Sequence, residues 1–188
     1  VVEKILEFLD KNLTPYIPEK GSVGASGDLA PMAHMALGLI GEGYLYHQKQ
    51  KMKAVEALKK AGVEPLRLSY KEGLSLINGT QFMTVLGSFA LERSREIEQV
   101  ADLASALSLD ALRGTIKAFD ERIHVIRKQS GQAMVARNML SLLDCESNEV
   151  MRSHENCDKV QDPYSFRCIP QVHGASRDAI LYCRTVVE

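Results

Sequence analysis

The most informative stretch of the chain is Gly21–Pro31, with the sequence GSVGASGDLAP, which centres on Ala25, Ser26 and Gly27. Minimal side chains at positions 25 and 27 would let the backbone nitrogen of Gly27 approach the carbonyl carbon of Ala25 in a strained conformation. Ser26 supplies a hydroxyl that can leave together with its α-proton, which would create a carbon electrophile that no side chain provides. The same residues also fit a plain loop before a helix, with a side-chain N-cap and a proline in the first turn.

The run continues through Met32–Leu37 and Ile40–Gly43, and over this length it resembles the active-site loop of the aromatic amino-acid lyase and aminomutase family. In that family an Ala-Ser-Gly triplet cyclises into 4-methylidene-imidazol-5-one. The resemblance therefore implies that Ala25, Ser26 and Gly27 form this electrophilic group, with no dissociable cofactor and no metal, and that the protein is an ammonia-lyase. A helix that begins here would direct its N-terminal dipole toward negative charge that develops at the group.

A second segment, Leu76–Thr80, has the sequence LINGT and follows in the family's order. In the family the asparagine of this segment hydrogen-bonds the oxygen of the prosthetic ring, so the resemblance implies that Asn78 polarises the electrophile. Without the resemblance, Asn78-Gly79 would be a turn dipeptide.

The third matching segment is Val160–Gly174. The resemblance implies that Gln161, Tyr164 and Arg167 line the active site, with Tyr164 catalytic and Gln161 and Arg167 binding substrate. The planar guanidinium of Arg167 suits a substrate α-carboxylate, which it binds through two parallel hydrogen bonds. Taken alone, Arg167 would be a surface cation and Tyr164 a half-buried packing residue.

The residues around these segments bear on the substrate. Val23-Gly24, Ala33–Met35 and Gln171–Gly174 resemble the histidine-specific branch of the family more than its phenylalanine and tyrosine lyases. This implies elimination of ammonia from L-histidine to give urocanate. Three alternatives stay open: a phenylalanine or tyrosine ammonia-lyase, an aminomutase that returns the ammonia to the β-carbon, and a non-catalytic helical assembly module.

The composition of the chain limits the classes of partner and the compartment that we expect. A net charge of −1 gives no case for nucleic acid or an anionic membrane surface, and no window approaches the roughly 18 consecutive apolar residues of a spanning helix. The four cysteines show no CxxC spacing and favour reduced thiols in a cytoplasmic protein. The histidines show no HExxH spacing, so we expect no metal, and we expect His47, His124 and His154 at the surface.

The chain as a whole predicts an all-α, long-helix bundle with at most a small β-hairpin. The hairpin is expected within Gly43–Lys53, and a mobile loop within Cys145–Lys159. The expected helices cover Val1–Leu13, Asp28–Leu39, Ala54–Ala61 with Gly62 as C-cap, Gln81 to about Leu112, Gln132–Leu143 and Ala175–Val187.

The resemblance also concerns domain organisation. Family members are much longer and carry a catalytic tyrosine in an N-terminal loop and further pocket residues in a C-terminal helical region, so residues 1–188 are expected to be a single helical core segment of a longer lyase chain. The family assembles as a homotetramer whose sites are built from several subunits. We therefore expect residues 1–188 by themselves to form a helical oligomer with negligible lyase activity.

Overall fold

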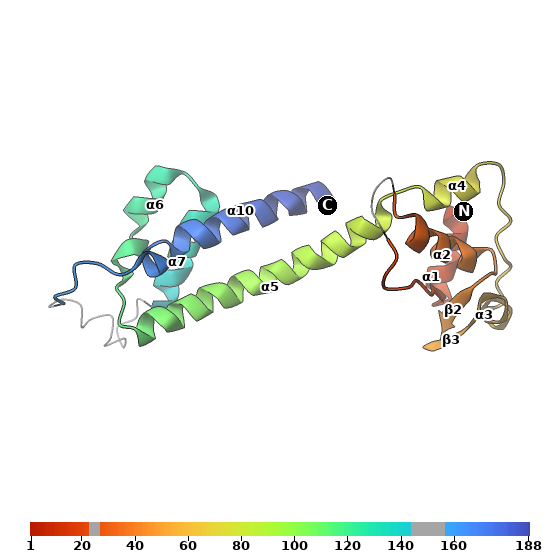
Figure 1. Ribbon diagram of the computed structural model, residues 1–188, viewed down its shortest axis with the longest axis horizontal. Helices are drawn as coiled ribbons and strands as arrows, with labels where there is room; N and C mark the ends of the chain where they lie inside the picture. The colour runs from red at the N-terminus through yellow and green to blue at the C-terminus, as the bar shows by residue number, and fades with distance from the viewer. Residues whose placement is uncertain (23–26, 144–156) are drawn as a thin grey trace. The chain divides into compact units, whose positions relative to one another are not determined.

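The computed structural model describes residues 1–22, 27–143 and 157–188. The chain divides into two compact units, Val1–Gly87 and Ser88–Glu188, and the boundary falls inside the long helix α5. Each unit has its own hydrophobic core. Figure 1 shows the helices and strands of both units, with α5 shared between them. The predicted fold class is confirmed, because the described residues are mostly helical and carry one small sheet.

The first unit contains, in order, α1 (Val2–Asp10), β1 (Thr14–Pro15), α2 (Leu29–Leu39), β2 (Tyr44–His47), β3 (Gln50–Lys53), α3 (Ala54–Ala61), α4 (Glu72–Ile77) and the first turns of α5 (Gln81–Ala111). The second unit contains the rest of α5, the 3₁₀ helix η1 (Ile116–Phe119), α6 (Glu121–Arg127), α7 (Ser130–Leu143), α9 (Tyr164–Arg167) and α10 (Ile169–Val187).

The sheet of the first unit is antiparallel in the order β1-β2-β3. The predicted hairpin is β2 and β3, in which Leu45 pairs with Met52. The two-residue strand β1 was not among the expected elements, and it pairs Pro15 with Leu45. Because so short a strand has no alternation of its own, its conformation comes from the pairing with β2.

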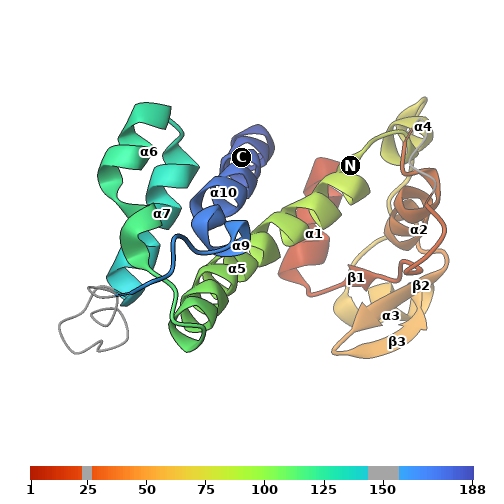
Figure 2. The ribbon, with the colours of Figure 1, turned by 60° about the vertical axis from the view of Figure 1, so that its left-hand side comes forward.

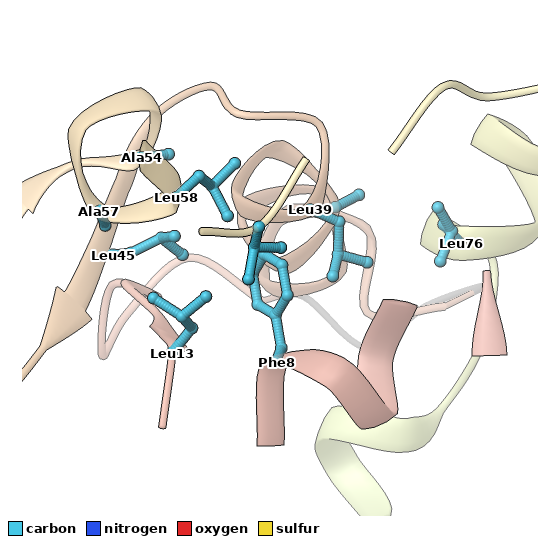
Figure 3. Close-up of a cluster of buried hydrophobic side chains, with 10 residues drawn as sticks. Phe8, Leu13, Leu39, Leu45, Ala54, Ala57, Leu58 and Leu76 are labelled. Atoms are coloured by element: carbon cyan, nitrogen blue, oxygen red, sulfur yellow. The ribbon is translucent and has the colours of Figure 1, made fainter. Parts of the chain in front are cut away.

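The core of the first unit lies between α1, α2, α3 and the sheet (Figure 3). Leu45 of β2 is fully buried there, and α2 lies close to it because Gly38 has no side chain: a Cβ at Gly38 would come 2.7 Å from Cδ2 of Leu45. The buried members of this core are Phe8, Leu13, Ala36, Leu39, Leu45, Ala54, Ala57, Leu58, Val63 and Leu76.

Helix α3 has the predicted bounds, and its C-cap Gly62 adopts the left-handed conformation with φ 68° and ψ 34°. This geometry is the usual helix stop at glycine, which has no Cβ to clash. The local signal was therefore sufficient to define this helix.

In the second unit, α7 and α10 lie side by side (Figure 2) and cross at two glycines. A Cβ at Gly131 would lie 2.3 Å from the carbonyl oxygen of Gly174, so only glycine permits this backbone contact. The buried core beside the crossing comprises Ala106, Leu109, Phe119, Val135, Ala136, Met139, Leu143 and Ile169.

A buried carboxylate links three helices of the second unit. Asp102 of α5, 3% exposed, accepts hydrogen bonds from Nδ1 of His173 at 2.9 Å, from Asn138 at 2.8 Å and from the guanidinium of Arg177 at 2.7 Å. His173 and Arg177 belong to α10, and Asn138 belongs to α7. A buried charge needs such compensation, because an unpaired one would cost several kcal/mol.

The structure corrects several expectations. The short helices α4, η1, α6 and α9 were not predicted, and α10 begins at Ile169 instead of Ala175. His124 is 1% exposed instead of lying at the surface: its Nε2 donates to the carbonyl of Ala118 and its Nδ1 accepts from Gln132. His154 and most of the expected loop at 145–159 lie outside the described residues.

The segment Glu72–Ala111 is long and apolar enough to cross a membrane by length and composition alone, with a mean hydropathy of 1.2 over its most apolar stretch, of which 6% is buried in this chain. Two of its features disfavour a bilayer core. The helix is interrupted between α4 and α5, and Glu92, Arg93, Arg95 and Glu96 crowd the middle of α5.

Candidate active site

The seven residues predicted for the site fall in different parts of the chain. Ala25 and Ser26 lie outside the described residues. Gly27 and Asn78 belong to the first unit, and Gln161, Tyr164 and Arg167 to the second.

Gly27 and Asn78 lie against each other, although 51 positions separate them in the numbering. A Cβ at Gly27 would lie 3.2 Å from Oδ1 of Asn78 and 3.3 Å from the backbone nitrogen of Gly79. Gly27 also has φ of +149°, a conformation that residues with a side chain rarely adopt. The first two segments singled out in the sequence therefore meet in one place.

Asp28 holds these segments together. Its backbone nitrogen donates to the carbonyl oxygen of Gly79 at 2.8 Å. Its carboxylate, in a residue 2% exposed, accepts from Oγ of Ser22 at 2.9 Å and from the backbone nitrogen of Met83 at 2.8 Å. The loop on both sides of the triplet is thus attached to the beginning of α5.

Sequence reasoning considered Asp28 only as a cap for the helix that follows it. Asp28 does stand at the N-cap position of α2, but its side chain makes no cap hydrogen bond there. It accepts instead from Met83 in the first turn of α5, where backbone N–H groups lack partners within the helix. An isolated acidic residue before an apolar helix was the signal that could have pointed to this role.

In the second unit, Arg167 and Tyr164 form a cation–π pair. The guanidinium carbon of Arg167 lies 4.4 Å from the ring centroid of Tyr164, and Nε donates to the backbone carbonyl of Asp162 at 2.7 Å. Among the residues that the structure describes, the two terminal nitrogens of Arg167 have no hydrogen-bond partner. These are the nitrogens that can bind a carboxylate in parallel.

Gln161 and Asp162 sit at the start of the same segment and line the same small hollow, but they differ in exposure. Gln161 is exposed and lines a small hollow of about 80 Å³ together with Thr115, Lys117 and Lys159. Asp162 is 6% exposed, and its carboxylate accepts from the backbone nitrogen of Thr115 at 2.6 Å. Asp162 was not singled out in the sequence.

Other polar features of the second unit involve none of these residues. A hollow of about 330 Å³ between α5, α7 and α10 contains none of the predicted site residues. Hydrogen bonds from Arg122 lower the pKa of Asp120 to about 2, at the exposed start of α6. Within the described ranges no group of three or more His, Cys, Asp or Glu residues is close enough to hold a metal ion.

The comparisons with known proteins agree with these segments. A sequence model of the family described as aromatic amino acid lyase matches residues 1–188. The chain belongs to this family. It is 50% identical over 187 residues to the histidine ammonia-lyase of Streptococcus sanguinis (strain SK36), which covers 100% of this chain and 36% of that protein. The chain therefore spans about a third of the length of this relative.

Two solved structures of the family extend the comparison. Histidine ammonia-lyase from Trypanosoma cruzi superposes with a TM-score of 0.78 at 43% identity, over 96% of this chain and 32% of that one. Phenylalanine aminomutase from Pantoea agglomerans superposes with a TM-score of 0.84 at 32% identity, over 98% of this chain and 38% of that one. The resemblance drawn from the three sequence segments is confirmed at the level of the family.

Proposed function

We propose that the protein containing this chain is a histidine ammonia-lyase, which eliminates ammonia from L-histidine to give urocanate. The observation that carries the proposal is the contact of Gly27 with Asn78 and Gly79, in a chain 50% identical to a histidine ammonia-lyase. This contact brings the end of the Ala25-Ser26-Gly27 triplet beside the amide expected to act on it.

The residues around the triplet fit the formation of 4-methylidene-imidazol-5-one. Gly27 occupies a place where a Cβ would crowd Asn78 and Gly79, and its positive φ supports a backbone that must close on itself. Ring closure joins the nitrogen of Gly27 to the carbonyl carbon of Ala25, and two molecules of water are lost, one of them with the hydroxyl of Ser26. The finished group supplies an electrophilic methylene carbon.

Asn78 is assigned the role of polarising this group. Its Oδ1 faces Gly27, and a half-turn about the bond between Cβ and Cγ would present the NH₂ group in the same place as a hydrogen-bond donor. A fixed donor of this kind stabilises charge that develops on a ring oxygen. Within the described residues the Asn78 amide has no competing hydrogen bond.

Arg167 is assigned to the substrate α-carboxylate. Its Nε is held by Asp162 and its plane by the ring of Tyr164, which leaves the two terminal nitrogens for a bidentate pair. Tyr164 and Gln161, both exposed in this chain, would position the remaining groups around the substrate.

The proposed assembly is a homo-oligomer. Its expected form is the tetramer of the family. Phe89, Ile97, Val100 and Leu107 project from one side of α5 at helical spacing, and each is more than 60% exposed. An apolar stripe of this length is normally covered. Residues 1–188 are in turn proposed to be one helical core segment of the longer lyase chain, which by itself associates through this stripe and has negligible activity.

The proposed compartment is the cytoplasm. The proposed ligand is an amino acid, and neither a nucleic acid nor a membrane is proposed as a partner. The cysteines at 157, 168 and 183 are free thiols, which suits a reducing compartment.

The test of the function replaces Ser26 with alanine in the protein that contains this chain. Wild-type protein should convert L-histidine to urocanate and show an intact mass two waters below the mass calculated from its sequence. Ser26→Ala should lose both the mass deficit and nearly all turnover, because alanine keeps the volume but has no leaving hydroxyl. A folded Ser26→Ala protein with unchanged turnover would contradict the proposal.

An aminomutase is the second candidate. The TM-score to the phenylalanine aminomutase is higher than that to the histidine ammonia-lyase of T. cruzi, while the sequence identities favour the lyase. Product analysis separates the two, because an aminomutase would yield a β-amino acid instead of urocanate.

A further inference from the structure

The end of α5 is joined to the segment that carries Arg167 by one buried side chain. After α5 ends, Arg113 adopts φ of +52° and the nitrogen of Gly114 donates to the carbonyl of Leu109 at 2.8 Å. The next backbone donor, the nitrogen of Thr115, has no such helical partner and donates to Oδ2 of Asp162 at 2.6 Å.

Gly114 makes this approach possible. A Cβ at Gly114 would lie 2.7 Å from Cγ of Leu109 and 3.3 Å from Oδ2 of Asp162. Since Asp162 is 6% exposed, its carboxylate would carry a large desolvation cost without a hydrogen bond. The interaction with Thr115 therefore fixes the place of Asp162 at the end of α5.

Asp162 also contacts Arg167, through its main chain. Its carbonyl oxygen accepts from Nε of Arg167 at 2.7 Å, and the same guanidinium lies over the ring of Tyr164. An arginine side chain loses conformational entropy when it is held in one conformation. Two contacts from its own segment hold this one before any ligand arrives.

We propose that Asp162 is a positioning residue of the carboxylate-binding segment. Its side chain attaches residues 161–167 to the end of α5, and its carbonyl sets the direction in which Arg167 presents its two terminal nitrogens. Asp162 itself does not touch the substrate. The inference rests on the proposed function only in that Arg167 is the group that binds the carboxylate.

The test compares two substitutions of Asp162 in the protein that contains this chain. Asp162→Ala removes the acceptor, so the amide of Thr115 should exchange its hydrogen faster and Arg167 should lose its fixed direction. Because the carboxylate is bound equally in the ground state and the transition state, KM for L-histidine should rise roughly tenfold to hundredfold with kcat within about threefold of wild type. Asp162→Asn keeps an oxygen acceptor for Thr115 and should recover most of the affinity.

Asp178→Ala is the matched control. Asp178 is also a carboxylate that accepts from a backbone nitrogen, that of Gly131 at 2.9 Å, and from Ser130, but it lies on α10 and has no hydrogen bond to residues 161–167. This variant should unfold more easily while KM stays at the wild-type value. A direct titration with urocanate, which keeps the carboxylate, should show the same order of affinities as KM.

Three results would overturn the inference: unchanged exchange of the Thr115 amide in Asp162→Ala, an equal rise of KM in Asp162→Ala and Asp178→Ala, or a fall in kcat at constant KM. If the proposed function itself is wrong, the result is different, because wild-type protein would then form no urocanate. If Asp162→Ala does not fold, Asp162→Asn with wild-type KM but fast Thr115 exchange would equally count against the inference.

Discussion

The carboxylate of Asp28 accepts a hydrogen bond from the backbone nitrogen of Met83, 55 residues further along the chain, at 2.8 Å. The same carboxylate accepts from Ser22, and the Asp28 nitrogen donates to Gly79. One buried acid thus connects the loop before the triplet, the segment that contains Asn78 and the first turn of α5.

The first prediction concerns the stability of this connection. Asp28→Ala removes a buried carboxylate that accepts from the nitrogen of Met83 and from Ser22, so we expect a loss of about 1–3 kcal/mol in the free energy of unfolding. Denaturant unfolding followed by circular dichroism measures this loss. Asp158→Ala, at an exposed position, should change stability by less than about 0.5 kcal/mol, and an equal effect of both substitutions would show that Asp28 carries no such connection.

The second prediction concerns the small size of Gly27. Gly27→Ala adds a Cβ 3.2 Å from Oδ1 of Asn78 at a positive φ, so the triplet should no longer close and the mass deficit of two waters should disappear. Gly87→Ala is the control, because a Cβ there meets nothing within 4 Å. It should keep the deficit and leave stability equal or slightly higher, since alanine favours a helix. Intact-mass measurement of both variants decides the matter, and a full deficit in Gly27→Ala would contradict the assigned role.

The third prediction concerns the guanidinium of Arg167. Arg167→Lys keeps the charge but loses the paired donors and the planar contact with Tyr164, so transition-state binding of L-histidine should weaken by about 1.5–3 kcal/mol. This is measured as the ratio of kcat/KM values. Histamine, which lacks the carboxylate, should inhibit wild type and variant equally. A similar loss for both ligands would mean that Arg167 acts on the structure of its segment and not on the carboxylate.

The fourth prediction concerns the apolar stripe of α5. Val100→Glu places a charge within the apolar stripe that Phe89, Ile97 and Leu107 form. Burying this charge in an oligomer would cost free energy, so the assembly should dissociate. Gln99→Glu adds the same charge to the neighbouring position, off the stripe, and should leave the assembly intact. Light scattering at low micromolar concentration distinguishes the two, and an intact Val100→Glu oligomer would show that this stripe is covered by something else.

Local signals were sufficient for much of the fold. The nearly all-apolar sequence of α2, the apolar spacing of α5 and the glycine after α3 each act over a short stretch of chain, and the elements they predicted are present. The helices α4, η1, α6 and α9 have four to seven residues, which is too short for a hydrophobic period to show. Their conformation depends on packing, as does the burial of His124, whose partners Ala118 and Gln132 belong to neighbouring elements.

Short motifs were enough to identify the family and the seven candidate residues, because such motifs record which atoms the chemistry needs. What holds those residues in place became visible only in the folded chain. Gly27 meets Asn78 across 51 positions, Asp28 reaches Met83 across 55, and Asp162 reaches Thr115 across 47. No local pattern encodes such pairs. In the last two, a buried carboxylate accepts from a backbone nitrogen that has no acceptor within a helix, and only folding brings the two groups together.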